Sequence, residues 1–124
     1  RLGSVTADDG EEIEVGVTFE TMPSALFDAA AVPGCKEAAD ELATVGHAGE
    51  FLKDQYRHAK PILALGAGAA LLEGAGIPGA LPSGEPDPGL LIETKRAVKE
   101  ILPRFIKAVA RHRHHERELD PPPV

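Results

Sequence analysis

The 124-residue chain has a single cysteine, no tryptophan and only 4% aromatic residues, although 43% of its residues are hydrophobic. One thiol, Cys35, cannot form a disulfide within the chain, so we expect a reducing compartment and a cytoplasmic protein. No signal peptide is visible, and no apolar run approaches the roughly 20 residues of a membrane span. The composition therefore predicts one small globular domain without a membrane segment.

Positive charge is also scarce, since 13 Lys and Arg face 20 Asp and Glu, giving a net charge of -7. This balance argues against a general nucleic-acid-binding surface, which needs clustered cations. Near the C-terminus, His112 and Glu116 have the four-residue spacing of one helix face. Structural zinc needs about four ligands, however, and the interleaved arginines would repel a cation. We interpret this segment as the solvated end of a helix and expect no metal site.

The most informative segment is the apolar run at residues 60–65, which leads through Gly66-Ala67-Gly68 into an Ala/Leu-rich stretch. This pattern predicts a buried strand, a tight elbow and a helix, the arrangement in which many α/β enzymes place a nucleophile. Neither Gly66 nor Ala67 has a side chain that can react. The third glycine of a dinucleotide-binding turn would fall at Leu71, so we interpret the glycines as permitting a sharp turn.

The remaining pattern alternates strands with helices. An Asp9-Gly10 turn precedes residues 13–19, whose period of two predicts a half-buried strand, and residues 28–32 predict a buried parallel strand. Helices are expected over residues 35–43, 46–58 and 67–75, followed by a Pro/Gly-rich loop and a strand at 90–92. Thr94 is the expected cap of a last helix with apolar positions Val98, Ile101, Leu102, Phe105, Ile106 and Val109. Such alternation predicts an α/β fold with a parallel sheet and helices on both faces.

Three motifs carry a family resemblance: residues 18–24 (TFETMPS), residues 32–34 (VPG) and residues 51–58 (FLKDQYRH) followed by Lys60-Pro61. Together they resemble the C-terminal domain of large-subunit monofunctional haem catalases. The resemblance implies a flavodoxin-like three-layer sandwich of the glutamine-amidotransferase-like superfamily, with its first strand, helix and strand lying before Arg1. It assigns residues 1–120 to this domain and residues 121–124 to a proline-rich tail.

Active members of that superfamily carry a cysteine where Gly66 stands, and often a histidine where Ala67 stands. The resemblance therefore implies an accessory domain with no catalytic residues and no cofactor of its own. Haem and the disproportionation of hydrogen peroxide would belong to the catalase core of the same polypeptide, which would assemble as a homotetramer. The role of the domain itself would be structural, assembly-supporting or chaperone-like.

Two other functions remain open. The chain is alternatively a free-standing stress protein or hydrolase of the superfamily, or a small-ligand module that binds at the carboxyl ends of its strands. A hydrolase would need an unexpected nucleophile such as Cys35, at a helix N-terminus that would partly stabilise a thiolate. No histidine lies near it in sequence, so we interpret Cys35 as a buried, inert side chain. Glu37, Asp40 and Glu41 are expected on an exposed helix face.

Overall fold

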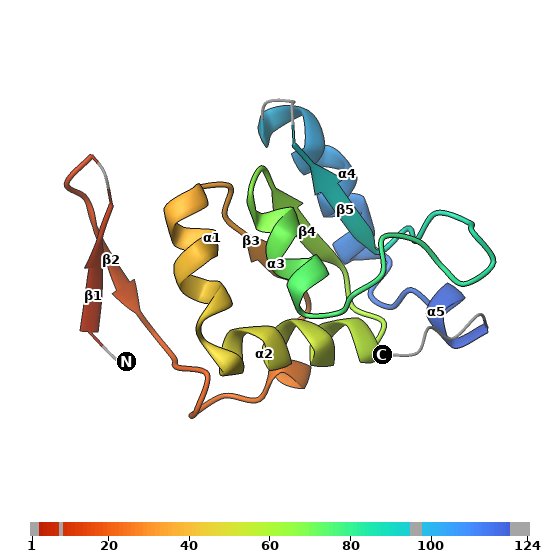
Figure 1. Cartoon of the computed structure of the whole chain (residues 1–124), viewed down its shortest axis with the longest axis horizontal. Helices are drawn as coiled ribbons and strands as arrows, with labels where there is room; N and C mark the ends of the chain where they lie inside the picture. Colours follow the sequence, from red (N-terminus) through yellow and green to blue (C-terminus); the bar gives the residue numbers. More distant parts are fainter. Residues whose placement is uncertain (1–2, 8, 95–97, 120–124) are drawn as a thin grey trace.

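The computed structural model describes residues 3–7, 9–94 and 98–119. Its centre is a three-stranded parallel sheet with strand order β3-β4-β5, formed by β3 (Ala30–Val32), β4 (Ile62–Leu65) and β5 (Leu90–Glu93) (Figure 1). Ala31, Leu63 and Leu91 are register partners across the three strands. The parallel sheet predicted from the alternating pattern is confirmed.

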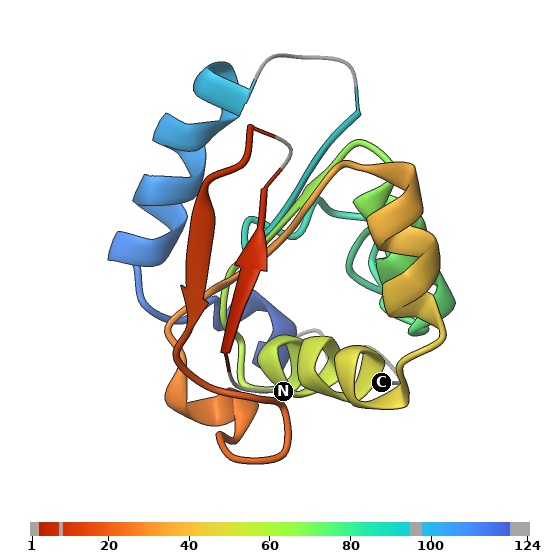
Figure 2. The same cartoon turned by 90° about the vertical axis from the view of Figure 1, so that its left-hand side faces the viewer.

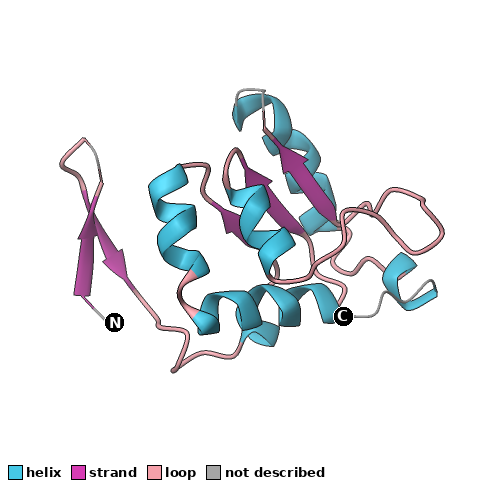
Figure 3. Cartoon of the chain, in the orientation of Figure 1, coloured by secondary structure: helices cyan, strands magenta, loops and turns pink. Residues whose placement is uncertain are grey.

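Helices cover both faces of this sheet (Figure 2). On one side lie α1 (Lys36–Ala43) and α3 (Gly68–Gly74), with α2 (Gly46–Arg57) running across one end; on the other side lies α4 (Val98–Ala110). Strands and helices therefore form three layers, as in flavodoxin-like domains (Figure 3). Within the described residues, no helix is both long and apolar enough to cross a lipid bilayer.

The alternation of side chains along β4 explains why both layers are needed. Ile62 and Ala64 are fully buried in a cluster with side chains of α2 and α3, whereas Leu63 points to the opposite face and packs with Ile101 of α4. A strand that is apolar on both faces must be covered twice. Leu65, expected to be buried, is only half-buried because it stands at the end of the strand.

A two-stranded antiparallel hairpin, β1 (Gly3–Thr6) with β2 (Glu12–Val15), lies apart from this sheet (Figure 1). The predicted turn is confirmed, but the strand ends at Val15 rather than reaching residue 19. The expectation that it is half-buried is wrong, because Val5 and Ile13 pair across the hairpin while exposing 54% and 53% of their surface. No other element of the described chain covers their shared face closely enough to bury them.

The C-terminal region departs most from expectation. Of the six apolar positions predicted for the last helix, Ile101 is buried, Phe105 and Val109 are half-buried, and Val98, Leu102 and Ile106 are exposed. Thr94 lies in an exposed bend, and residues 95–97, between it and the start of α4 at Val98, lie outside the described part of the chain, so its predicted capping role stays a prediction. The predicted tail at 121–124 also lies outside the described residues. Beyond α4, a turn leads to the short helix α5 (Glu116–Leu119), which folds back onto the protein.

Candidate functional site

The candidate site is the elbow between β4 and α3. Gly66 has a φ of +45°, a left-handed conformation that glycine adopts without strain, and it turns the chain into α3 within three residues. Its amide donates a hydrogen bond to the carbonyl of Glu93 at 2.8 Å. The predicted strand, elbow and helix are confirmed.

The loop after β3 packs directly against this elbow. A Cβ placed on Gly66 would lie 2.9 Å from the carbonyl oxygen of Gly34, and one placed on Gly68 would lie 2.7 Å from that of Pro33. The amide of Ala67 lies 3.3 Å from the same Gly34 oxygen. Glycines at these positions therefore serve backbone-to-backbone packing, and the space where a nucleophilic side chain would project is filled by the neighbouring loop.

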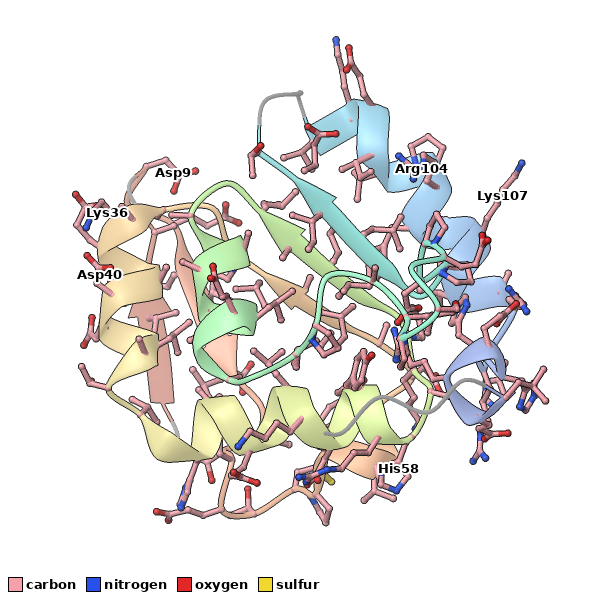
Figure 4. The ribbon with its side chains drawn as sticks, turned by 45° about the vertical axis from the view of Figure 1, so that its right-hand side comes forward. Asp9, Lys36, Asp40, His58, Arg104 and Lys107 are labelled. Carbon is pink, nitrogen blue, oxygen red and sulfur yellow. The ribbon has the colours of Figure 1, made fainter. Side chains whose placement is uncertain are left out.

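Cys35 lies beside the elbow as the N-terminal cap residue of α1. Its thiol is exposed, so the expectation of a buried side chain is wrong, and its Sγ donates a hydrogen bond to Oε2 of Glu37 at 3.0 Å. This hydrogen bond, followed by that from the backbone, lowers the pKa of the Glu37 carboxyl. The predicted exposed face is confirmed for Glu37, Asp40 and Glu41, and Asp40 pairs with Lys36 along α1 (Figure 4).

A second polar cluster, which sequence reasoning missed, lies where α5 meets the body. Nε of Arg117 donates to Oδ2 of Asp87 at 2.6 Å, and its Nη1 donates to the carbonyls of Tyr56 and Lys60 at 3.1 and 2.8 Å. The guanidinium carbon lies 4.3 Å from the centre of the Tyr56 ring, a cation–π geometry. Arg117 thereby joins α5, α2 and the loop before β5.

His114 completes this cluster and exposes only 1% of its surface. Its Nε2 lies 3.0 Å from the carbonyl of Ala108, so this nitrogen carries the hydrogen, and its Nδ1 has no partner among the described residues. Burial is the main cause that lowers the pKa of His114, with Arg117 and Arg111 adding to it. The interpretation of residues 112–116 as a solvated helix end is therefore wrong: α4 ends at Ala110, and the chain turns inward at His114.

Few features of the sequence indicate the cluster of Arg117, Asp87 and His114. Asp87 stands in a Pro/Gly-rich stretch that reads as an exposed loop, and Arg117 stands among other charged residues. A periodic sequence pattern cannot predict that Arg117 and Asp87 pair, because 30 residues separate them. The described residues contain no group of three or more His, Cys, Asp or Glu placed to hold one metal ion.

Fold and site together define an α/β domain with a nucleophile elbow that carries glycine instead of a reactive residue. Residues 3–118 match the C-terminal domain found in long catalases, and the chain belongs to this family. It is 35% identical to catalase HPII of Mycobacterium avium, covering 98% of the chain and 18% of the relative. Catalase HPII of Pseudomonas putida is 36% identical over 92% of the chain and 14% of the relative, and catalase-2 of Bacillus subtilis is 33% identical over 96% and 16%. The chain thus spans less than a fifth of the length of these curated relatives.

Proposed function

We propose that the chain is a non-catalytic accessory domain of a large catalase, whose core binds haem and disproportionates hydrogen peroxide to water and oxygen. The observation that carries the proposal is the elbow. Gly66 offers no reactive atom, and the carbonyl of Gly34 occupies the space where a side chain would begin. Family membership supplies the context of a catalase.

The domain's own role is to support the core of the same polypeptide, as a structural or chaperone-like unit of a cytoplasmic homotetramer. Its exposed apolar side chains support this role. Leu102 and Ile106 on α4 expose 39% and 64% of their surface, and Val5 and Ile13 on the hairpin expose more than half. Contiguous exposed apolar groups mark surfaces that another protein surface covers.

The hydrolase alternative is favoured by one observation, the exposed thiol of Cys35 at the N-terminus of α1. A thiol nucleophile needs a base that accepts its proton. The group that meets its Sγ is Glu37, whose pKa is lowered, and a carboxylate of lowered pKa is a poorer proton acceptor. This chemistry favours the accessory role over hydrolysis.

The test compares the full-length catalase with the same protein ending before Arg1, both loaded with haem. We expect oxygen release per haem to agree within about twofold, because the domain contributes nothing to the chemistry, whereas the shortened protein should lose its assembly at lower urea concentration. Assembly is followed by light scattering after size-exclusion chromatography. A folded, assembled shortened protein with strongly reduced turnover per haem contradicts the non-catalytic role.

A second measurement separates the hydrolase alternative. The full-length protein is assayed for ester and amide hydrolysis beside two of its variants. Cys35→Ser is the test variant, and Thr44→Ser, an exposed conservative change at the opposite end of α1, is the control. We expect background hydrolysis in every case. Hydrolysis that Cys35→Ser abolishes and Thr44→Ser preserves overturns the accessory role.

A further inference from the structure

The C-terminal segment, residues 111–119, is attached to the domain by polar contacts rather than by a hydrophobic core. The two hydrophobic clusters of the described chain contain no residue after Ala108. Leu119, the one apolar side chain of the segment, exposes 85% of its surface. A segment without buried apolar side chains gains little from the hydrophobic effect, so its attachment depends on individual hydrogen bonds and ion pairs. Loss of one such contact can release the segment while the sheet stays folded.

Two residues of the segment carry its described contacts with the end of α2 and the loop before β5. Arg117 makes the ion pair with Asp87 and the hydrogen bonds to the end of α2. The amide of His114 donates to the carbonyl of Ala59 at 2.6 Å. The imidazole of His114 packs against Gly89, where an added Cβ would lie 2.6 Å from the ring. Docking of the segment therefore requires the ring to be seated beside Gly89.

The docked position of His114 suits only the neutral imidazole. His114 exposes 1% of its surface, and its Nε2 donates to the carbonyl of Ala108 at 3.0 Å. A proton taken up by the ring would go to Nδ1, which is buried and has no partner among the described residues. The imidazolium would place a charged donor in the interior without an acceptor, which is costly. Uptake of a proton is therefore favoured only when His114 has left this position.

The charges around His114 do not offset that cost. The charged groups near the ring, taken from the elements packed against it, are Arg104, Lys107 and Arg111 of α4 and its end, Asp87 before β5, Glu116 and Arg117 of α5, and Lys60 after α2. Each of the two carboxylates is engaged by an arginine, Asp87 by Arg117 and Glu116 by Arg111. Tyr56 adds an uncharged ring, because burial raises the pKa of its phenol. Cations thus outnumber carboxylates around the imidazole in the described part of the chain.

We propose that residues 111–119 form an acid-sensitive latch, which is docked while His114 is neutral and is released when Nδ1 of its imidazole takes up a proton. In the released segment the ring lies in water and titrates with an ordinary histidine pKa of about 6.5. Attachment is therefore complete above about pH 6.5, and below it the released population grows by up to about tenfold per pH unit. Release uncovers the Asp87 carboxylate and the Tyr56 ring. The latch is separate from the elbow and does not depend on the accessory role.

The test is amide hydrogen exchange of the full-length protein, followed by mass spectrometry of peptides from residues 111–119 and from β4. Rates are measured at about pH 7.5 and about pH 5.5, and each is divided by the intrinsic rate of an unstructured peptide at that pH. We expect the corrected exchange of residues 111–119 to rise about three- to tenfold at the lower pH, because the released His114 binds a proton that the docked one does not. A rise of less than about twofold overturns the proposal.

Low concentrations of urea distinguish release of the segment from unfolding of the whole domain. Global unfolding exposes far more surface than local release does, so urea below the unfolding transition should accelerate exchange in β4 much more than in residues 111–119. The segment should also be protected at least about a hundredfold less than β4. Equal protection and equal urea dependence in the two regions would show that the segment opens only when the domain unfolds, which contradicts a latch.

Two histidine variants within the segment assign the effect to one ring. His114→Gln cannot take up a proton, so its exchange in residues 111–119 should change less than about twofold between the two pH values. His115→Gln removes an exposed neighbour and should keep the pH dependence of the parent. Loss of protection at pH 7.5 in His114→Gln alone also supports the proposal, because it shows that the neutral ring docks the segment. A pH dependence that persists in His114→Gln, or disappears in His115→Gln, overturns it.

Discussion

Asp87 and Arg117 form an ion pair that is almost completely withdrawn from water, with 0% and 3% of their side-chain surfaces exposed. The pair joins the loop before β5 to α5, and Arg117 also reaches two carbonyls at the end of α2. Because water cannot replace either partner, each charge depends on the other. The stability of the C-terminal segment is therefore concentrated in this contact.

Asp87→Asn should lower the free energy of unfolding by about 3 to 5 kcal/mol, because it leaves the Arg117 charge buried without its counterion. Asp40→Asn is the control, since it breaks an ion pair with Lys36 that lies in water and contributes little to stability. Urea unfolding followed by circular dichroism measures both. Equal urea midpoints for the two variants would show that the buried pair contributes no more to the free energy of unfolding than the exposed pair does.

The free energy of unfolding should fall as the solution is acidified below about pH 6.5. Protonation of His114 in the unfolded chain should cause part of this decrease. Its pKa is lowered in the folded protein by burial, so below the ordinary histidine pKa the unfolded chain binds a proton that the folded chain does not. Above that pKa both states are neutral and His114 contributes no slope. The slope reaches at most about 1.4 kcal/mol per pH unit and ends once pH passes the folded pKa.

Urea titrations at several pH values check this prediction with His114→Gln and, as control, His115→Gln at an exposed position. The His114 variant is less stable at pH 8 but should lose less on acidification than the parent. The His115 variant should follow the parent. Parallel pH profiles in all three proteins would exclude His114 as the source.

Gly66→Ser, which returns a hydroxyl to the elbow, should destabilise the protein by about 1 to 3 kcal/mol and create no hydrolase. The new Cβ would meet the Gly34 carbonyl at 2.9 Å in a left-handed backbone conformation. Gly49→Ala, inside α2 with only a 4.0 Å contact, should be neutral or stabilising. Melting temperatures and ester hydrolysis are measured together, and a stable, active Gly66→Ser protein would refute the packing argument.

Leu63→Ala should cost about 2 to 5 kcal/mol, because it opens a cavity between β4 and Ile101 of α4. Leu65→Ala should cost less, since that side chain is half-buried, and Arg113→Ala at an exposed site should change little. The melting temperatures of the three variants, measured by thermal unfolding, rank the three substitutions by their cost in stability. A melting shift for Arg113→Ala equal to that of Leu63→Ala would mean that the core is misplaced.

The chain alone, supplied with haem, should release no more oxygen from peroxide than free haem does. The reason is that the family domain lies outside the part proposed to bind haem, and the elbow offers no axial ligand at Gly66 or Ala67. Oxygen-electrode traces with matched haem concentrations measure this. Turnover clearly above free haem would assign catalytic chemistry to this segment.

The sequence was sufficient to predict the sheet and the elbow because both depend on local patterns. Ile62 to Leu65 is apolar at every position, as a strand buried on both faces must be, and Gly66 marks the turn by the conformation that it permits. The motif resemblance then correctly gave the family.

What the sequence did not reveal depends on contacts between distant segments. Arg117 lies among exposed charges, and only the folded chain shows that it meets Asp87 and the Tyr56 ring. Cys35 was expected inside because cysteines are commonly buried, yet as the cap residue of α1 it lies at the surface. Ile13 has the alternation of a half-buried strand, but alternation does not say whether another element covers the apolar face.

The link between Arg117 and the end of α2 also has a kinetic consequence. The donor and the carbonyl of Tyr56 are separated by 61 residues, and Arg117 lies in the last helix of the described chain. During synthesis, Asp87 is made 30 residues before Arg117, so the nascent domain must hold this carboxylate without its counterion until the C-terminal segment follows. Non-local contacts of this kind also form late in refolding because they close long loops. We therefore expect the C-terminal segment to dock onto α2 and the loop before β5 after the sheet has formed.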